Sequence, residues 1–225
     1  MEHISKLDNP VWYSLSETHQ NHVINFGNIK FYKPDYAPFG AIKFDENIAK
    51  ALAEYSKLIK TFLIVGSKPK LPENVTIVNR LSGLQMVTFN KIDLPTTEKI
   101  IKLNSSHLKE VLGLVKLVYP EYFKEKTFYM GNYYGIFKNN QLAAITGERM
   151  QTNDFIEVSA VITHPNHTRQ GYAKQLIAHT VNTIISQGKI PFLHVAESNT
   201  GPIKLYESLG FTIRREMSFW VLTRK

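Results

Sequence analysis

One segment of the sequence, Phe155 to Ser186, restricts the fold more than any other. Its start is apolar and β-branched and stops before Pro165, which predicts a strand over 155–163 and then a short loop. From about Gly171 the apolar residues recur with helical spacing, so we expect a helix that runs to Ser186. Small residues, Gly171 and Ala173, stand at its start. Because a helix N-terminus has free amides and a positive dipole end, the segment predicts a sheet whose connecting loop can hold an anion.

The residues around this segment predict further strands and helices in the order β-α-β-β-β-α-β-α-β-β. A hairpin turn is indicated at residues 138–140, Lys-Asn-Asn, between two apolar runs. The expected strands are Lys99–Leu103, Tyr133–Phe137, Gln141–Thr146, Phe155–Thr163, Phe192–Val195, Thr212–Arg215 and Phe219–Leu222. The expected helices start at Ser105 or Ser106, Gly171 and Asn199 and end near Val118, Ser186 and Leu209. This order predicts the α/β (α+β) class, a mixed sheet with helices on its faces.

The first part of the chain predicts a smaller α/β unit. Polar residues and a proline interrupt the apolar pattern between Asn90 and Thr97, so we place a domain boundary there. The expected units are residues 1–92 and 97–225. In the first unit the pattern predicts strands Ile29–Tyr32, Thr61–Val65, Val75–Val78 and Leu84–Phe89 and a helix Asn47–Leu58. This unit carries no chemical motif.

The amino-acid composition excludes some classes of function and disfavours others. The chain has 225 residues and a formal net charge of +8, but its 27 Lys and Arg residues are scattered. Such a pattern favours a solvated basic surface over a nucleic-acid site, and a phosphorylated small molecule would use the same field. The absence of cysteine excludes disulfides, thiolate metal sites and a cysteine nucleophile, and it fits the cytoplasm. No apolar run approaches the roughly 20 residues of a membrane span, so we expect no membrane partner.

A second motif follows the expected strand at Phe192–Val195. Residues 199–211 read NTGPIKLYESLGF. With the loop Arg169-Gln170-Gly171-Tyr172-Ala173, this motif closely resembles the GNAT superfamily of N-acetyltransferases. Its members carry Arg/Gln-x-x-Gly-x-Gly/Ala, then a strand, then an Asn and a Leu-Tyr-Glu-x-Leu-Gly-Phe helix. The resemblance covers residues 97–225. It departs from the family at Thr168, where members prefer Arg or Gln, which predicts weaker pyrophosphate binding.

The resemblance implies a fold and a cosubstrate. The fold is a mixed, mostly antiparallel central sheet with two splayed strands and flanking helices. The cosubstrate is acetyl-CoA, the acyl donor, without a metal. In the family the splayed strand presents backbone groups to the pantetheine, and one amide polarises the thioester. The loop and the first helical turn bind the pyrophosphate, and an Asn bonds the pantetheine or caps its helix. The implied cofactor-binding residues are Val161, Ile162, Thr163, Arg169, Gln170, Gly171, Tyr172, Ala173, Lys174 and Asn199.

The resemblance also proposes two catalytic residues. Glu157 precedes Gly171 by fourteen positions, the separation at which several of these enzymes place a catalytic Glu. Its apolar neighbours predict partial desolvation and a raised pKa, which would suit a general base, but a strand ion pair explains it equally well. Glu148 is a second carboxylate that could share this role or form a salt bridge. Tyr206 matches the residue that protonates the departing thiolate, or it is a core aromatic.

The expected reaction is acetyl transfer to a primary amine of a small molecule or peptide. A lysine-like amine of pKa about 10.4 costs about 4.6 kcal/mol to deprotonate at pH 7, so it needs a base. Two alternatives stay open, namely a different acyl-CoA or acceptor, and a noncatalytic CoA-binding module. The histidine pairs 19/22 and 164/167 lack a third ligand, so we expect no metal site. Residues 119–134 and the first unit are expected to form the acceptor pocket. The first unit is a degenerate second GNAT half, a lid or the surface of a homodimer.

Overall fold

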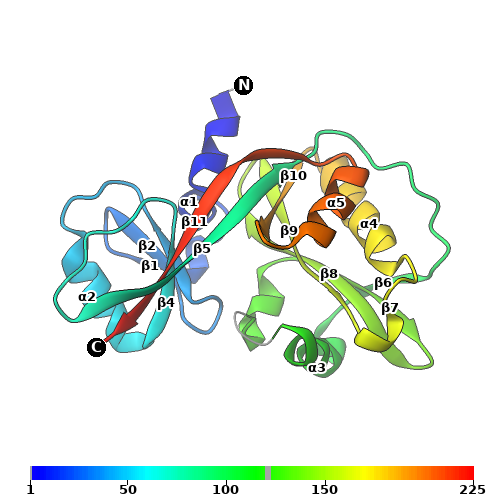
Figure 1. Ribbon diagram of the computed structural model, residues 1–225, viewed down its shortest axis with the longest axis horizontal. Helices are drawn as coiled ribbons and strands as arrows, with labels where there is room; N and C mark the ends of the chain where they lie inside the picture. The colour runs from blue at the N-terminus through cyan, green and yellow to red at the C-terminus, as the bar shows by residue number, and fades with distance from the viewer. Residues whose placement is uncertain (1, 120–122) are drawn as a thin grey trace.

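The computed structural model describes residues 2–119 and 123–225, and eleven strands in these residues form one sheet (Figure 1). Its strand order is β1-β2-β3-β4-β11-β5-β10-β9-β8-β7-β6. Two neighbouring pairs, β3 with β4 and β9 with β10, are parallel, and the others are antiparallel. The mixed, mostly antiparallel sheet with flanking helices confirms the predicted fold class.

The elements follow the sequence prediction closely in the second part of the chain. The strands are β1 Val23–Asn25, β2 Ile29–Tyr32, β3 Phe39–Ile42, β4 Thr61–Val65, β5 Val75–Val87, β6 Ile100–Leu103, β7 Tyr133–Lys138, β8 Gln141–Gln151, β9 Phe155–Thr163, β10 Ile190–Ala196 and β11 Thr212–Arg224. The helices are α1 Pro10–Ser16, α2 Ile48–Leu58, α3 Leu108–Val118, α4 Tyr172–Ser186 and α5 Thr200–Ser208. Three of these elements, α1, β1 and β3, were not predicted.

Two long strands cross the middle of the molecule. β5 and β11 pair antiparallel from Val87 with Thr212 to Val75 with Arg224 (Figure 1). The prediction of two short strands in each segment was wrong, because main-chain pairing continues through polar residues such as Asn79 that interrupt the apolar pattern. β11 also pairs with β4, and β5 also pairs with β10. This pair of strands therefore joins both parts of the chain in one sheet, and the boundary at residues 92–97 stays a prediction.

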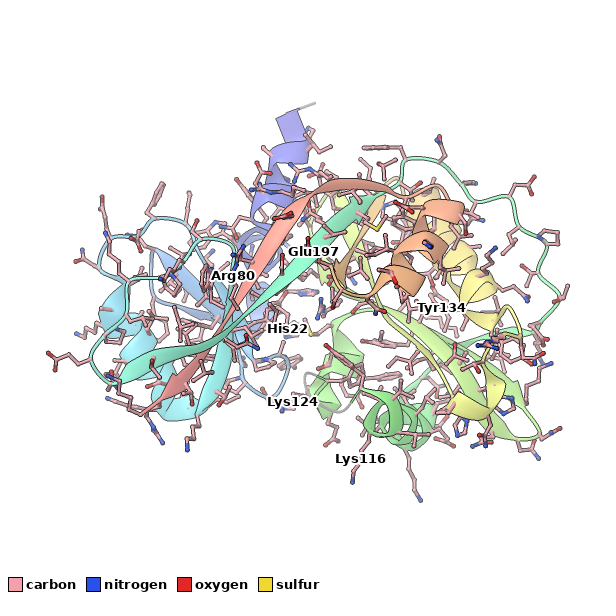
Figure 2. All side chains as sticks on the ribbon, viewed as in Figure 1. His22, Arg80, Lys116, Lys124, Tyr134 and Glu197 are labelled. Carbon is pink, nitrogen blue, oxygen red and sulfur yellow. The ribbon has the colours of Figure 1, made fainter. Side chains whose placement is uncertain are left out.

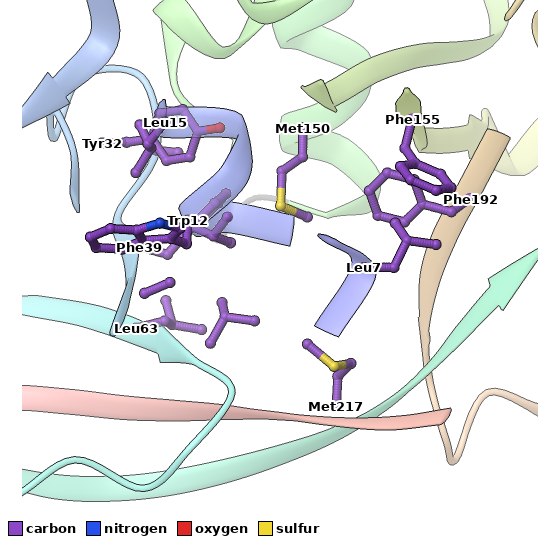
Figure 3. Close-up of a cluster of buried hydrophobic side chains, with 14 of the residues drawn as sticks. Leu7, Trp12, Leu15, Tyr32, Phe39, Leu63, Met150, Phe155, Phe192 and Met217 are labelled. Carbon is purple, nitrogen blue, oxygen red and sulfur yellow. The ribbon is translucent and has the colours of Figure 1, made fainter. Parts of the chain in front are cut away.

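The largest hydrophobic cluster lies where the two parts meet. Residues of the N-terminal segment, such as Leu7 and Trp12, pack with Phe39 of β3, Met150 of β8 and Phe192 of β10 (Figure 3). Leu7 and Phe192 are fully buried. Burying one side chain of this size contributes roughly 1.5–3 kcal/mol, so the N-terminal segment is an integral part of the core.

A buried polar cluster also holds the N-terminal segment in place. His19 Nδ1 lies 3.1 Å from Ser14 Oγ and 3.0 Å from Tyr32 Oη, and its Nε2 lies 3.0 Å from the carbonyl oxygen of Met130. A carbonyl only accepts, so Nε2 carries the proton and Nδ1 accepts. Burial, with a smaller contribution from His22, lowers the pKa of His19 to about 4. The imidazole is therefore neutral at pH 7.

Candidate active site

The sheet opens between β9 and β10. These parallel strands pair at three positions, and the ladder ends where Glu157 faces Phe192. Beyond that point β9 continues to Thr163 against β8, while β10 continues to Ala196 against β5. The ends of the two strands diverge because each follows a different neighbour. The splayed strands that the family resemblance implied are present, and they leave a gap between residues 158–163 and 193–196.

A bulge deforms β9 beside this gap. Ile162 faces Ile145 and Ser159 faces Gly147, so two residues of β9 lie opposite one residue of β8. Ala160 in the bulge has a φ of 49°, a left-handed conformation that costs a residue with a side chain on the order of 1–3 kcal/mol. The bulge takes residues 160–161 out of regular pairing with β8. The strained backbone lies in the strand that was expected to contact the thioester.

The predicted pyrophosphate loop leads into α4. Gly171 is the N-cap residue and has a φ of 75°, and no side chain caps the helix. An added Cβ on Gly171 would meet no atom within 4 Å, so its backbone conformation, and not space, favours glycine. The first turn contains no acidic residue, and both Arg169 and Lys174 are exposed beside it. The free amides, the helix dipole and these two charges together suit a phosphate group.

Other predicted residues of this loop have local roles. Thr168 Oγ1 donates to the carbonyl oxygen of Pro165 at 3.3 Å, so its side chain supports the turn. Gln170 is exposed, Ala173 is half-buried, and Tyr172, the first residue of α4, is buried. The structure therefore brings the residues of the predicted loop together at one end of α4.

α5 carries the two other residues that the motif predicted. Asn199 occupies the N-cap position, but its side chain makes no capping hydrogen bond, so the capping interpretation is not supported. Tyr206 is buried in a cluster with Val158 of β9 and Val195 of β10. Burial raises the pKa of Tyr206 to about 12. Its phenol is therefore protonated at neutral pH, and it lies against both splayed strands.

Glu157 is an ion-pair residue with a low pKa. Its Oε2 accepts from Arg149 Nε at 2.7 Å, and its Oε1 accepts from Arg149 Nη2 at 2.8 Å and from His194 Nδ1 at 2.8 Å. Burial works to raise the pKa of Glu157, but the charge and hydrogen bonds of Arg149, with those of His194, outweigh it and lower the pKa to about 2. The predicted upward shift was wrong because the sequence did not show these two partners.

His194 connects Glu157 to a wider network. Its Nε2 lies 3.2 Å from Nε2 of Gln85, which also donates to the carbonyl oxygen of Leu7 at 2.8 Å. Arg214 Nη1 donates to Oε1 of the same Gln85 at 2.9 Å, which fixes the orientation of the amide. Since a carboxylate only accepts, this network assigns the proton of His194 to Nδ1 and a lone pair to Nε2. Sequence reasoning missed His194, although a histidine within an apolar strand beside the motif was a usable signal.

Glu148 has amide partners instead of a cation. Its Oε2 accepts from the backbone and side-chain nitrogens of Asn132 at 3.0 and 2.9 Å. Burial is the main cause of a raised pKa for Glu148, and these hydrogen bonds oppose it. Its Oε1 is buried and has no hydrogen-bond partner among the described residues. Glu148 lines neither of the cavities at the gap, and within the described ranges it forms no salt bridge.

Two adjoining cavities lie at the gap. The larger has a volume of about 160 Å³, and the smaller has a volume of about 80 Å³. Phe39, Tyr119 and Arg149 line both of them. The described residues that line the larger one are Phe39, Leu63, Val65, Leu81, Ser82, Gly83, Tyr119, Arg149, Met150, His194, Val195, Ala196 and Phe219. Tyr119, Phe123 and Thr127, from the segment predicted to form the acceptor pocket, line the smaller one, whereas residues 120–122 lie outside the described residues.

In each of the two histidine pairs the rings lie close together. The rings of His19 and His22 are 5.4 Å apart, and those of His164 and His167 are 5.6 Å apart. Within residues 2–119 and 123–225 no group of three or more His, Cys, Asp or Glu side chains is placed to hold a metal ion. In the same residues no helix combines the length and apolar character needed to cross a membrane.

A sheet that opens beside a helix with an uncapped N-terminus matches the splayed strands and the phosphate-binding loop that the family resemblance implied. The model of the FR47-like protein family matches residues 133–221. A protein from Novosphingobium aromaticivorans DSM 12444, described as an acetyltransferase of the GNAT family, is 30% identical over 97% of this chain and 98% of its own, with a TM-score of 0.88. The chain therefore belongs to the GNAT family, as the motifs predicted, and is an acetyltransferase in that general sense.

Two more distant structures share the fold. A GCN5-related N-acetyltransferase from Kribbella flavida is 15% identical, covers 96% of this chain and 95% of its own, and has a TM-score of 0.66. A GCN5-related N-acetyltransferase-like protein from Streptococcus suis 89/1591 is 14% identical, covers 97% of each chain, and has a TM-score of 0.63. Both extend over nearly the whole chain, so the fold of the first ninety residues recurs with that of the rest. No curated protein matches the sequence significantly.

Proposed function

We propose that this chain is an acetyl-CoA-dependent N-acetyltransferase that acts on a primary amine. The observation that carries the proposal is the gap between β9 and β10, which adjoins the uncapped N-terminus of α4. An extended donor with a phosphate group at one end and a thioester at the other fits these two features. Family membership supports acetyl-CoA as that donor.

The residues at the gap fit acetyl-CoA. The loop at Arg169 and Gly171 and the amides that begin α4 suit the pyrophosphate. The edge of β9 at Val161, with residues 162 and 163, would pair with the pantetheine amides, and the free side chain of Asn199 would add one hydrogen bond. Acetyl-CoA supplies the activated acyl group. The protein supplies the amides, charges and proton-transfer groups around it.

The proton transfers follow from three side chains. Transfer forms a bond from the acceptor nitrogen to the acetyl carbonyl carbon and breaks the carbon–sulfur bond. His194 lines the larger cavity. Its Nε2 lone pair accepts from Gln85 Nε2, so the acceptor nitrogen displaces this amide before Nε2 takes the proton that the nitrogen loses. Glu157 is only 1% exposed, so it acts through His194 by holding the Nδ1 proton and is a positioning residue. Tyr206 gives its proton to the departing thiolate and recovers one from solvent.

The test is binding of acetyl-CoA to two matched glycine variants. Gly171 and Gly188 stand at opposite ends of α4, and both have a φ of 75° with no atom within 4 Å of an added Cβ. In the wild type, acetyl-CoA at about a hundred times its Kd stabilises by about 2.7 kcal/mol, a rise in Tm of several degrees. We expect Gly171→Asp to abolish this rise, because its carboxylate repels the phosphates, and Gly188→Asp to keep it.

Turnover is then measured as thiol release with primary amines, and the lack of cysteine keeps the protein from contributing thiols. A wild type without any rise in Tm at millimolar acetyl-CoA would refute the choice of donor. A rise in Tm that persists in Gly171→Asp would show that the donor does not bind at the start of α4. A normal rise in Tm without turnover of any amine would indicate a noncatalytic CoA-binding module instead of an enzyme.

A further inference from the structure

The larger cavity at the gap has the size and lining of a binding site for one small apolar group. We propose that it binds the apolar group of the acceptor, so that the substrate is a primary amine with a single ring or a branched alkyl group of that size. This inference rests on the proposed function, because it names the acceptor of the same reaction. It also gives the first part of the chain a role in substrate recognition.

The walls of this cavity come from both parts of the chain. Phe39, Leu63 and Val65 lie on β3 and β4, and Leu81 and Phe219 lie on the long strands β5 and β11. All five side chains are apolar. A closed cavity of about 150 Å³ lined by Leu, Ile and Phe holds benzene, so the apolar part of this cavity of about 160 Å³, which adjoins a wider one at Leu81, Ser82 and Ala196, accommodates one ring. A long polyamine or a peptide backbone would leave its polar groups unpaired against these walls.

Among the described residues that line the cavity, the one cation, Arg149, is already paired with a carboxylate. Arg149 lines the cavity, but two of its nitrogens are held by Glu157 at 2.7 and 2.8 Å. The two charges cancel, and His194 stands beside them with an Nε2 lone pair that Gln85 Nε2 occupies until the acceptor displaces it. This arrangement places the nitrogen of the acceptor at His194 and its apolar group toward Phe39 and Phe219. Amino acids are therefore poor acceptors.

The position of the larger cavity favours the acceptor as its occupant, and not a longer acyl chain of the donor. Tyr206, Val158 and Leu193 pack together with α4, on the side where the donor is proposed to bind. Ile162 and Ala160 instead pack with α3, and both line the smaller cavity that adjoins the larger one. Figure 1 shows α3 on one side of β8 and β9 and the pair α4 and α5 on the other. A donor held at α4 and α5 thus reaches the gap from one side, and the cavity receives its partner from the other.

The experiment compares two phenylalanine substitutions on β5. Leu81 lines the cavity, so Leu81→Phe reduces its volume. Val78 lies on the same strand outside the cavity and is 57% exposed, so Val78→Phe is the matched control. The acceptors are 2-phenylethylamine and 3-methylbutylamine, with ethanolamine, spermidine and glycine as comparisons. Acetyl-CoA binding, measured as the rise in Tm, is recorded for each variant as a check on folding and on the donor site.

We expect the wild type to prefer 2-phenylethylamine and 3-methylbutylamine by kcat/KM. Leu81→Phe should lower this value for 2-phenylethylamine about tenfold or more, because pocket contacts of one or two carbons change specificity by about 10–200-fold. Val78→Phe should leave it unchanged, and both variants should keep the rise in Tm with acetyl-CoA. Phe219→Ala should enlarge the cavity and bring 2-(1-naphthyl)ethylamine into use.

Binding of 2-phenylethylamine without acetyl-CoA provides a readout that is independent of turnover. It should perturb the NMR signals of the wild type and of Val78→Phe, but not those of Leu81→Phe. Preference for glycine or spermidine would overturn the inference, as would an effect of Leu81→Phe on acyl-chain length instead of on the amine. If acetyl-CoA fails to bind while the amine binds in this pattern, the proposed donor is refuted and the amine site stands.

Discussion

Glu148 on β8 and Glu157 on β9 are both 1% exposed, yet their surroundings give them opposite properties. Glu157 has a guanidinium and an imidazole as partners, and its pKa falls to about 2. Glu148 has the amides of Asn132, and its pKa is raised mainly by burial. Burial alone therefore does not predict the direction of a pKa shift. The nearest charge decides it, and the following predictions use this contrast.

The largest expected effect is a loss of catalysis when His194, the hydrogen-bond partner of Glu157, is substituted. His194→Gln should lower kcat/KM about 10²–10⁴-fold, the usual contribution of a positioned general base. The loss should grow with the basicity of the acceptor amine, because a more basic amine depends more on a base. His3→Gln, at a side chain that is 69% exposed, is the control and should behave like the wild type. An equal loss for weakly and strongly basic amines would assign His194 a purely structural role.

The second effect is on stability and concerns Arg149. Arg149→Met leaves the Glu157 carboxylate buried without its main partner, so unfolding by urea should require about 3–5 kcal/mol less free energy. Adding Glu157→Gln to this variant should recover part of the loss, because the uncompensated charge is then gone. The single variant Glu157→Gln gives the loss of stability from that change alone. If Glu157→Gln lowers the stability of Arg149→Met by the same amount, the two residues are not coupled.

The third expected effect is a loss of stability at acidic pH, and it involves the buried His19. Its pKa is lowered from 6.5 to about 4 by burial, so its contribution to stability is present above pH 6.5 and is lost as the pH falls through 4. That loss amounts to about 3 kcal/mol at a slope of about 1.36 kcal/mol per pH unit. Urea denaturation between pH 7 and 4 should show this slope in the wild type. A slope of the same size in His19→Gln would exclude His19 as its source.

The smallest effect distinguishes the two carboxylates by the sign of their pH dependence. The lowered pKa of Glu157 makes its contribution present above its unfolded pKa of about 4.5 and lost as the pH falls toward 2. Because the pKa of Glu148 is raised in the folded state, the stability that it contributes is fully present below its unfolded pKa. This stability is lost as the pH rises through its folded pKa. Glu148→Gln should therefore change stability by less than about 1 kcal/mol at pH 7, in the stabilising direction. A loss above 2 kcal/mol would show that the ionised form is needed.

The sequence was sufficient to predict the structural elements that depend on residues close together in the chain. The strand at 155–163, the loop at Gly171 and the helix after it all follow from local apolar spacing and turn residues, and they proved correct to within a residue or so. The splay of β9 and β10 followed from the family motif and not from the spacing. The roles of Glu157 and Tyr206 stay predictions. Local patterns and motifs thus predicted the elements that form the proposed donor side of the site.

The parts that were not predicted depend on contacts between distant residues. Arg149 and His194 meet Glu157 only because β8, β9 and β10 are adjacent in the sheet, and the sequence spacing does not reveal this. The walls of the larger cavity combine Phe39 with Phe219, which are far apart in the chain. The same non-local packing orders α1, whose seven residues are too few for a stable isolated helix. The proposed acceptor side of the site therefore could not be predicted without the structure.

The position of β11 between β4 and β5 has a consequence for how the protein is made. During synthesis β4 and β5 leave the ribosome before β6 to β10, and β11, the strand that bridges β4 and β5, follows only after those strands. Until then two edges of the nascent sheet lack their hydrogen-bonding partner, and an exposed edge can pair with another chain. Completion of the walls around the larger cavity also awaits Phe219. The proposed acceptor site can thus form only after β11 has been translated.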